Sequence, residues 1–226
     1  MVVDCGGGTA DLISYEVVSI SPMVVRECVQ GQGMLGVTCT CSLRGTYLTA
    51  TLGGLCGAVF ADEAFQKMLK KKFGSAQWDK MKAQSRTNII HAQWEHMIKP
   101  DFDGRDRTWE IAVPFECLDL KLLKAAAELP TVQLNAEDVR SVFRPTVDKI
   151  REMVKEQVAA VRAKKGADPK VGGSPFAPAS SLDTDRFVLQ YIILVGGFGR
   201  SQYLFASLKG TFGHDIEVLQ SRGAGP

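Results

Sequence analysis

The sequence lacks any apolar run of about 18 residues, the length that a membrane-spanning helix needs, so no membrane partner is expected. It also lacks a strong charge of either sign: 27 lysines and arginines face 25 acidic residues, for a net charge of +2. No nucleic-acid partner is therefore indicated. The first residues have no leader-like pattern, and the expectation is a cytoplasmic protein.

Histidine is scarce, with three residues in 226, and His91, His96 and His214 form no metal-ligand pattern. No nucleophile signature such as a Ser–His–Asp set or HExxH occurs. The six cysteines have no disulfide-scaffold spacing, which favours a reducing compartment. With 45% hydrophobic and 23% charged residues, the composition is that of a globular protein with one large domain or two subdomains around a cleft.

What the sequence does have is a glycine-rich turn between two apolar runs at its start, MVVDCGGGTADLISYE. Three consecutive glycines let the backbone take positive φ and bring N–H groups close to an anion. A threonine and two aspartates flank the glycines, and these groups suit a phosphate with Mg²⁺ or its waters. Because the turn leads into a predicted strand, it differs from the P-loop and dinucleotide motifs, which open a helix.

A second glycine turn follows an apolar run near the other end, in FVLQYIILVGGFGRSQYL at 187–204. DCGGGTAD, at 4–11, resembles the second phosphate motif of the actin-like ATPase superfamily in the form found in 70-kDa heat-shock chaperones. The 187–204 segment resembles that superfamily's adenosine motif. VVRECV and GLCGAVF further resemble the divergent heat-shock-like proteins common in fungi.

The resemblance implies an α/β fold: an actin-like ATPase (ribonuclease H-like) lobe, with a mixed sheet flanked by helices and a smaller α/β subdomain inserted. It covers the second of two lobes. No first-lobe Asp-x-Gly-Thr motif or catalytic lysine is found, and no peptide-binding β-sandwich follows. We therefore expect a truncated fragment of the family's nucleotide-binding domain.

The resemblance also assigns site residues. It implies catalytic roles for Asp4, which would position the waters of Mg²⁺, and for Thr9 and Asp11. The implied nucleotide-binding residues are Gly6, Gly7, Gly8, Gly57, Glu95, Lys99, Gly196, Gly197 and Arg200. Arg200 would stack on adenine. The alternatives are ordinary turn carboxylates at 4 and 11, and a surface ion pair between Glu95 and Lys99, which lie four residues apart rather than the family's three.

Residue periodicity predicts the elements that carry these motifs. The predicted strands are 1–5, 11–20, 23–30, 108–116, 187–195 and 215–220. The predicted helices are 58–73, 75–98, a short helix or turn at 119–128, a long helix that Asn135 caps and Pro145 kinks or divides, and 201–211. The predicted parts are 1–73 and 187–226 as lobe core, 74–134 as outer subdomain, 135–163 as a helix returning to the core, and 164–186 as a flexible linker.

Residues 34–53, MLGVTCTCSLRGTYLTATLG, interrupt the part of the sequence that resembles the family. They lack helix periodicity and could at best form a β-hairpin. A metal site at Cys39 and Cys41 is disfavoured, because two cysteines cannot fill a tetrahedral zinc site. We interpret the segment as an insertion with the character of a translated retained intron.

The sequence thus predicts an ATP- or ADP-binding lobe that uses Mg²⁺, with client or co-chaperone proteins as further partners. Without the other lobe, we expect weak or absent ATP binding and no hydrolysis of ATP. The alternatives are a non-enzymatic remnant or interaction module, and a fragment of another actin-fold ATPase or sugar kinase.

Overall fold

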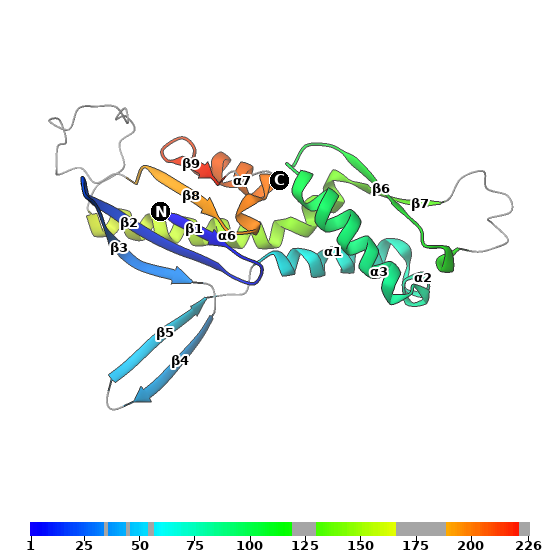
Figure 1. Ribbon diagram of the computed structural model, residues 1–226, viewed down its shortest axis with the longest axis horizontal. Coiled ribbons are helices and arrows are strands. Elements are labelled where there is room, and N and C mark those ends of the chain that lie inside the picture. The colour runs from blue at the N-terminus through cyan, green and yellow to red at the C-terminus, as the bar shows by residue number, and fades with distance from the viewer. Residues whose placement is uncertain (34–35, 44–45, 54–56, 119–129, 166–188, 222–226) are drawn as a thin grey trace. The chain divides into compact units, whose positions relative to one another are not determined.

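The computed structural model in Figure 1 describes residues 1–33, 36–43, 46–53, 57–118, 130–165 and 189–221. The chain forms two compact units. The first unit is Met1–Ala58, Val147–Arg200 and Leu204–Pro226, and the second is Val59–Thr146 with Ser201–Tyr203. None of the helices in the described ranges has the length and apolar character that crossing a membrane would require.

A five-stranded mixed sheet forms the centre of the first unit (Figure 1). Its strands, in the order β3-β2-β1-β8-β9, are β3 (Met23–Gly33), β2 (Ala10–Ile20), β1 (Val2–Cys5), β8 (Tyr191–Val195) and β9 (Glu217–Gln220). The pairs β1–β2 and β2–β3 are antiparallel, whereas β1–β8 and β8–β9 are parallel. The expected mixed α/β architecture is confirmed at this level.

One face of the sheet is buried and the other is largely open. The buried side chains alternate along the strands, as for Val3 and Cys5 on β1, and their partners in register are buried too. Helix α6 (Ala136–Lys165) contacts the buried face, where Gln157 Nε2 donates to Ser14 Oγ at 3.3 Å. Helix α7 (Gln202–Phe212) contacts α6 through Arg151 Nη1 and Ser207 Oγ.

The second unit is mainly helical. Its elements are α1 (Ala58–Phe73), α2 (Ser75–Lys80), α3 (Ala83–Asn88), the π-helix η1 (Ile89–Ile98), α4 (Lys99–Asp101), the 3-10 turn η2 (Phe115–Cys117), the antiparallel pair β6 (Thr108–Ala112) and β7 (Thr131–Asn135), and the start of α6. Aromatic rings fill its core: Trp94 stacks on Phe65 with centroids 4.1 Å apart, and Phe102 stacks on Phe143 at 5.4 Å.

The predicted continuous helix at 75–98 is wrong. The chain is extended at Met81 and Lys82, and the segment continues as α3 and then as the π-helix. Glu116 lies at this break: its Oε1 accepts hydrogen bonds from the Lys82 amide at 3.1 Å and the Ser85 hydroxyl at 2.6 Å. A carboxylate from a distant segment therefore holds the chain at the break inside the predicted helix.

Helix α1 has the predicted bounds, and its buried stripe is Ala61, Phe65, Leu69 and Phe73. Two smaller points differ from the prediction. Strand β6 ends at Ala112, shortly before Pro114, not at 116. Strand β7 was not predicted. The predicted turn at 119–128, residues 166–186 of the predicted linker, and residues 187–188 of the next predicted strand lie outside the described residues.

Helix α6 begins as predicted. Asn135 Oδ1 accepts from the Asp138 amide, and Asp138 Oδ2 accepts from the Asn135 amide, both at 2.9 Å. This reciprocal pair is a capping box. Division at Pro145 is wrong, because the helix continues through the proline for a total of 30 residues.

The inserted segment contains two strands that pair only with each other in the described part of the chain, β4 (Gly36–Leu43) and β5 (Thr46–Gly53). This agrees with the predicted β-hairpin.

Candidate functional site

The turn between β1 and β2 holds the first group of predicted site residues. Gly6 N donates to Thr9 O at 2.9 Å and closes the turn, and Thr9 Oγ1 donates to Asp11 Oδ2 at 3.3 Å. Asp4 and Asp11 are direct partners in the antiparallel register, and both are exposed. Residues opposite each other in a ladder share a face, so the two carboxylates lie side by side on the open face of the sheet.

The turn after β8 lies directly beside this pair. Strands β1 and β8 are parallel, with Asp4 opposite Val195, so the turns that follow the two strands lie at the same end of the sheet. Gly196 has φ +83°, and a β-carbon placed there would come within 2.4 Å of both Asp4 Oδ1 and Cys5 O. Only glycine fits this position, because both the backbone conformation and the space exclude a side chain.

Gly57 closes another side of the same turn. A β-carbon at Gly57 would lie 2.2 Å from Gly7 O, and Ala58 N donates to Gly6 O at 3.3 Å. The start of α1 is therefore packed backbone to backbone against the glycine turn. The structure of the first unit thus brings together three segments that are remote in sequence.

Other glycines of the site have no such reason to be glycine. A β-carbon at Gly7, Gly8 or Gly197 would meet nothing within 4 Å, and none of the three has a positive φ. The first turn does not use the positive φ that its glycines allow, whereas Gly196 in the second turn does. Gly7, Gly8 and Gly197 are exposed, so their backbone faces open space.

Two further residues of the glycine turns behave differently. Arg200, in the 3-10 turn η4 (Phe198–Arg200), is exposed, whereas Phe198 is buried. Cys5 is fully buried, as expected for a packed small apolar residue rather than a nucleophile.

Glu95 and Lys99 belong to the second unit, and each has a partner there. Lys99 Nζ lies 2.5 Å from Asp62 Oδ1, and the same oxygen accepts from Trp94 Nε1 at 2.6 Å. Glu95 pairs with His91 across 2.8 Å. Glu95 and Lys99 therefore pair with His91 and Asp62 rather than with each other. Sequence reasoning missed Asp62, since nothing local marks it as a shared acceptor for residues more than 30 positions away.

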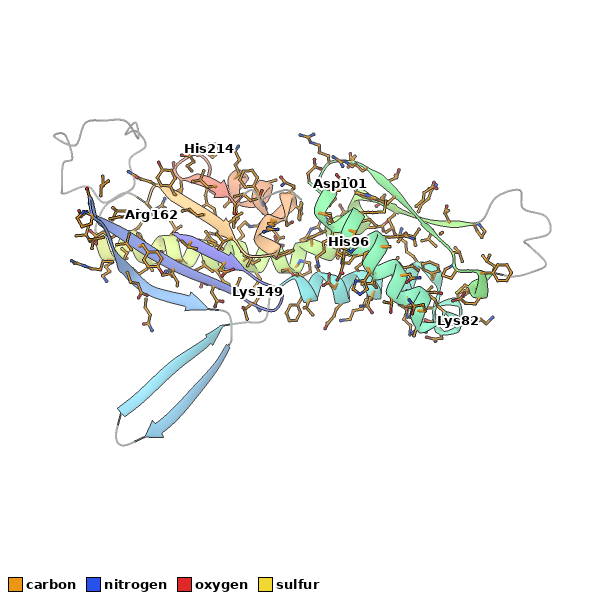
Figure 2. The ribbon with its side chains drawn as sticks, in the orientation of Figure 1. Lys82, His96, Asp101, Lys149, Arg162 and His214 are labelled. Atoms are coloured by element: carbon orange, nitrogen blue, oxygen red, sulfur yellow. The ribbon has the colours of Figure 1, made fainter. Side chains whose placement is uncertain are left out.

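The second unit also has an open hollow of about 420 Å³ between β6 and the start of α6. Its charged side chains satisfy one another, because Arg140 pairs with Glu137 and lies near Asp106. Hydrogen bonds from Arg140 and Arg144 hold the pKa of Glu137 below its ordinary value of 4.5. Nearby, Asp101, labelled in Figure 2, forms an ion pair with Arg107. This hollow offers no unpaired charge to a ligand.

Among the described residues, no three His, Cys, Asp or Glu side chains are grouped to hold a metal ion. His96, labelled in Figure 2, lies on η1, and the labelled His214 follows α7. Comparison of the sequence with protein-family models and with curated proteins finds no match. Assignment of a function therefore depends on the two glycine turns and on the sequence motifs that form them.

Proposed function

We propose that the chain is the ATP- or ADP-binding lobe of an actin-like ATPase of the 70-kDa heat-shock type. The observation that carries the proposal is the contact of Gly196 with Asp4, which joins the two motifs that the resemblance names. These motifs lie at opposite ends of the sequence, and a nucleotide that uses both would need them side by side. The mixed sheet with helices against its buried face also agrees with the proposed fold.

The open glycines support a phosphate ligand. Glycine loses more conformational entropy on folding than other residues, and it is required where φ is positive or where a neighbouring group leaves no room for a side chain. Neither reason applies at Gly7, Gly8 and Gly197. Close approach of an external group to the backbone supplies the missing reason, and exposed amide groups in a turn are suited to phosphate oxygens.

The exposed Asp4 and Asp11 pair supports Mg²⁺ bound together with the phosphates. Mg²⁺ keeps several waters and is usually held by one or two carboxylates plus substrate phosphates rather than by a full protein cage. Two neighbouring carboxylates, with the Thr9 hydroxyl on Asp11, fit that mode. When bound, Mg²⁺ would neutralise phosphate charge, while Asp4 would orient its waters.

The remaining roles follow the resemblance. Arg200 would stack on the base, and Gly57 would let the start of α1 approach the phosphate turn. The adenosine contacts that the resemblance implies for Glu95 and Lys99 stay a prediction, and Asp62 pairs with the Lys99 ammonium within the second unit. Hydrolysis is not proposed for this chain alone, because catalysis of phosphoryl transfer depends on positioning and charge stabilisation, and the resemblance places part of both in another lobe.

Calorimetric titration with MgATP and MgADP tests the proposal. We expect binding weaker than about micromolar, because the resemblance places part of the site in another lobe, with a further loss of about tenfold in Asp4→Asn for the Mg²⁺-dependent part. Asp215→Asn is the matched control, since Asp215 is a half-exposed aspartate of the same unit whose nearest cation, on Arg162, is 3.8 Å away. Absence of heat with both nucleotides, or equal affinity in Asp4→Asn and the parent chain, would contradict the proposal.

A further inference from the structure

The far end of the β2–β3 ribbon exposes an unusual amount of apolar surface. Seven large apolar side chains between Tyr15 and Val25 are 42% or more exposed, with Ile20 at 75% and Met23 at 74%. We call this stretch the apolar ribbon. It contains neighbouring pairs such as Val17 and Val18, so both faces of the ribbon are exposed. Monomeric proteins rarely expose contiguous apolar patches above roughly 300–600 Å², and larger ones mark interaction sites.

The apolar ribbon is also the edge of a sheet. Strand β3 is the outermost strand of the five, and within the described ranges it has a ladder partner on one side only, β2. Each residue of β3 from Met23 to Glu27 has a partner on β2, and the register shifts once within this stretch, between Val25 and Val24, where Val18 of β2 has no partner, and again beyond Glu27. Natural edge strands are normally protected by charged residues, proline or bulges. In Met23–Glu27 the charged residues are confined to Arg26 and Glu27, the stretch contains no lysine or proline, and the extra residue of the bulge lies on β2.

The charge pattern of β3 favours a second copy of the same strand as the occupant of this edge. Its only charged residues are Arg26 and Glu27. In an antiparallel pair related by a two-fold axis, one residue lies opposite its own copy. Placing Arg26 or Glu27 there puts like charges opposite each other, which is destabilising. Placing Val25 there avoids both repulsions and sets Val24 opposite the aliphatic stem of Arg26, and Met23 opposite Glu27.

We propose that two copies of this chain associate through antiparallel pairing of β3 edges, with Val25 opposite Val25. The pairing would join the five-stranded sheets of the two copies into one continuous sheet of ten strands. It would use the stretch Met23–Glu27 and cover the neighbouring exposed side chains of β2. A closed two-fold contact of this kind uses the same patch on both copies and leaves no free edge at β3. The inference is independent of nucleotide binding.

Cysteine cross-linking tests the register. In Val25→Cys, directly opposed β-carbons would be about 4.5–5.5 Å apart, which is close enough for a disulfide. The matched control is Met23→Cys, which is more exposed than Val25 but lies four residues out of register with its own copy. Under mild oxidation by dissolved oxygen, we expect a covalent dimer in Val25→Cys only, and peptide mass spectrometry should show a bridge from position 25 to position 25.

Sedimentation analysis of the parent chain over a range of concentrations gives the second readout. We expect a monomer–dimer equilibrium that Val25→Lys weakens more than about tenfold, because the new ammonium groups would face each other in an apolar contact. Val59→Lys, with a similar exposure on α1, should leave the equilibrium unchanged. A parent chain that stays monomeric throughout, equal effects of the two lysine variants, or preferential cross-linking at position 23 would each overturn the proposal.

Discussion

The backbone of Gly196 lies against the carboxylate of Asp4, so closely that a methyl group on Gly196 would come within 2.4 Å of Asp4 Oδ1. Strand pairing fixes this relationship, because β1 and β8 are parallel neighbours that end together. The two residues are therefore held in place by the sheet rather than by flexible loops, which suits a preorganised site.

Gly196→Ala should destabilise the chain by about 2–4 kcal/mol, because alanine would be strained at positive φ and would overlap with Asp4 and Cys5 O. Urea unfolding followed by circular dichroism measures the change. Gly197→Ala is the control: it should change the free energy of unfolding by less than about 1 kcal/mol, since its φ is ordinary and the space is empty. Under the proposed function, Gly197→Ala should still weaken nucleotide binding. A Gly196→Ala variant as stable as Gly197→Ala would show that the contact is wrong.

Asp62 should stabilise the second unit through two donors at once. Asp62→Ala would leave the Trp94 indole N–H and the Lys99 ammonium without their shared acceptor, and Trp94 is fully buried. We expect a loss of about 2–4 kcal/mol. Asp62→Asn keeps an acceptor for the indole and should cost less. The two variants are compared by chemical denaturation, and equal losses would argue against the indole hydrogen bond.

Asn135 should stabilise the start of α6. Asn135→Ala removes the acceptor of the Asp138 amide and should cost about 1 kcal/mol, whereas Asn135→Ser should retain most of the stability because serine is also a good N-cap. Thermal unfolding of the two variants provides the measurement. No difference between alanine and serine at this position would count against the capping box.

Stability should fall in acid because several carboxyl groups have lowered pKa values in the folded chain. The pKa of Glu137 is lowered from 4.5 by hydrogen bonds from Arg140 and Arg144, and that of Glu152 by a hydrogen bond from Lys155. A carboxyl group whose pKa is lower in the folded than in the unfolded chain stabilises the fold at any pH above its unfolded pKa. This stabilisation is lost as the pH falls through the folded pKa. The loss should therefore begin near pH 4.5 and continue below it.

Glu137→Gln should flatten this part of the pH dependence, as measured by denaturant unfolding at a series of pH values. Arg144→Met should flatten it in part, because Arg144 is one of the two donors to Glu137. An unchanged slope in both variants would show that the Glu137 cluster does not contribute.

The sequence was most informative where structure depends on neighbours along the chain. The alternation and turn signals at the start predicted β1, β2 and β3, and the repeated valines after Asn135 predicted α6 with its cap. It failed at 75–98, where the chain is extended at Met81 and Lys82 and the Lys82 amide donates to Glu116, a carboxylate from a different segment. Periodicity alone could not anticipate that long-range contact.

The candidate site shows the same division. The composition of the first turn indicated open backbone amides, and the structure has them at Gly7 and Gly8. The reason for glycine at Gly57 and Gly196 is tertiary, since each is packed against a turn from another part of the chain. No local pattern distinguishes those two kinds of glycine.

Helix α6 has one further consequence. Its residues up to Thr146 belong to the second unit, and those from Val147 onward belong to the first. If one half of this helix unfolded while the other half stayed helical, the helix would fray at the junction between the two halves. Pro145 lies at that junction and already removes one backbone hydrogen bond. Despite being two units, the chain should therefore unfold as one cooperative transition, with calorimetric and van't Hoff enthalpies in agreement.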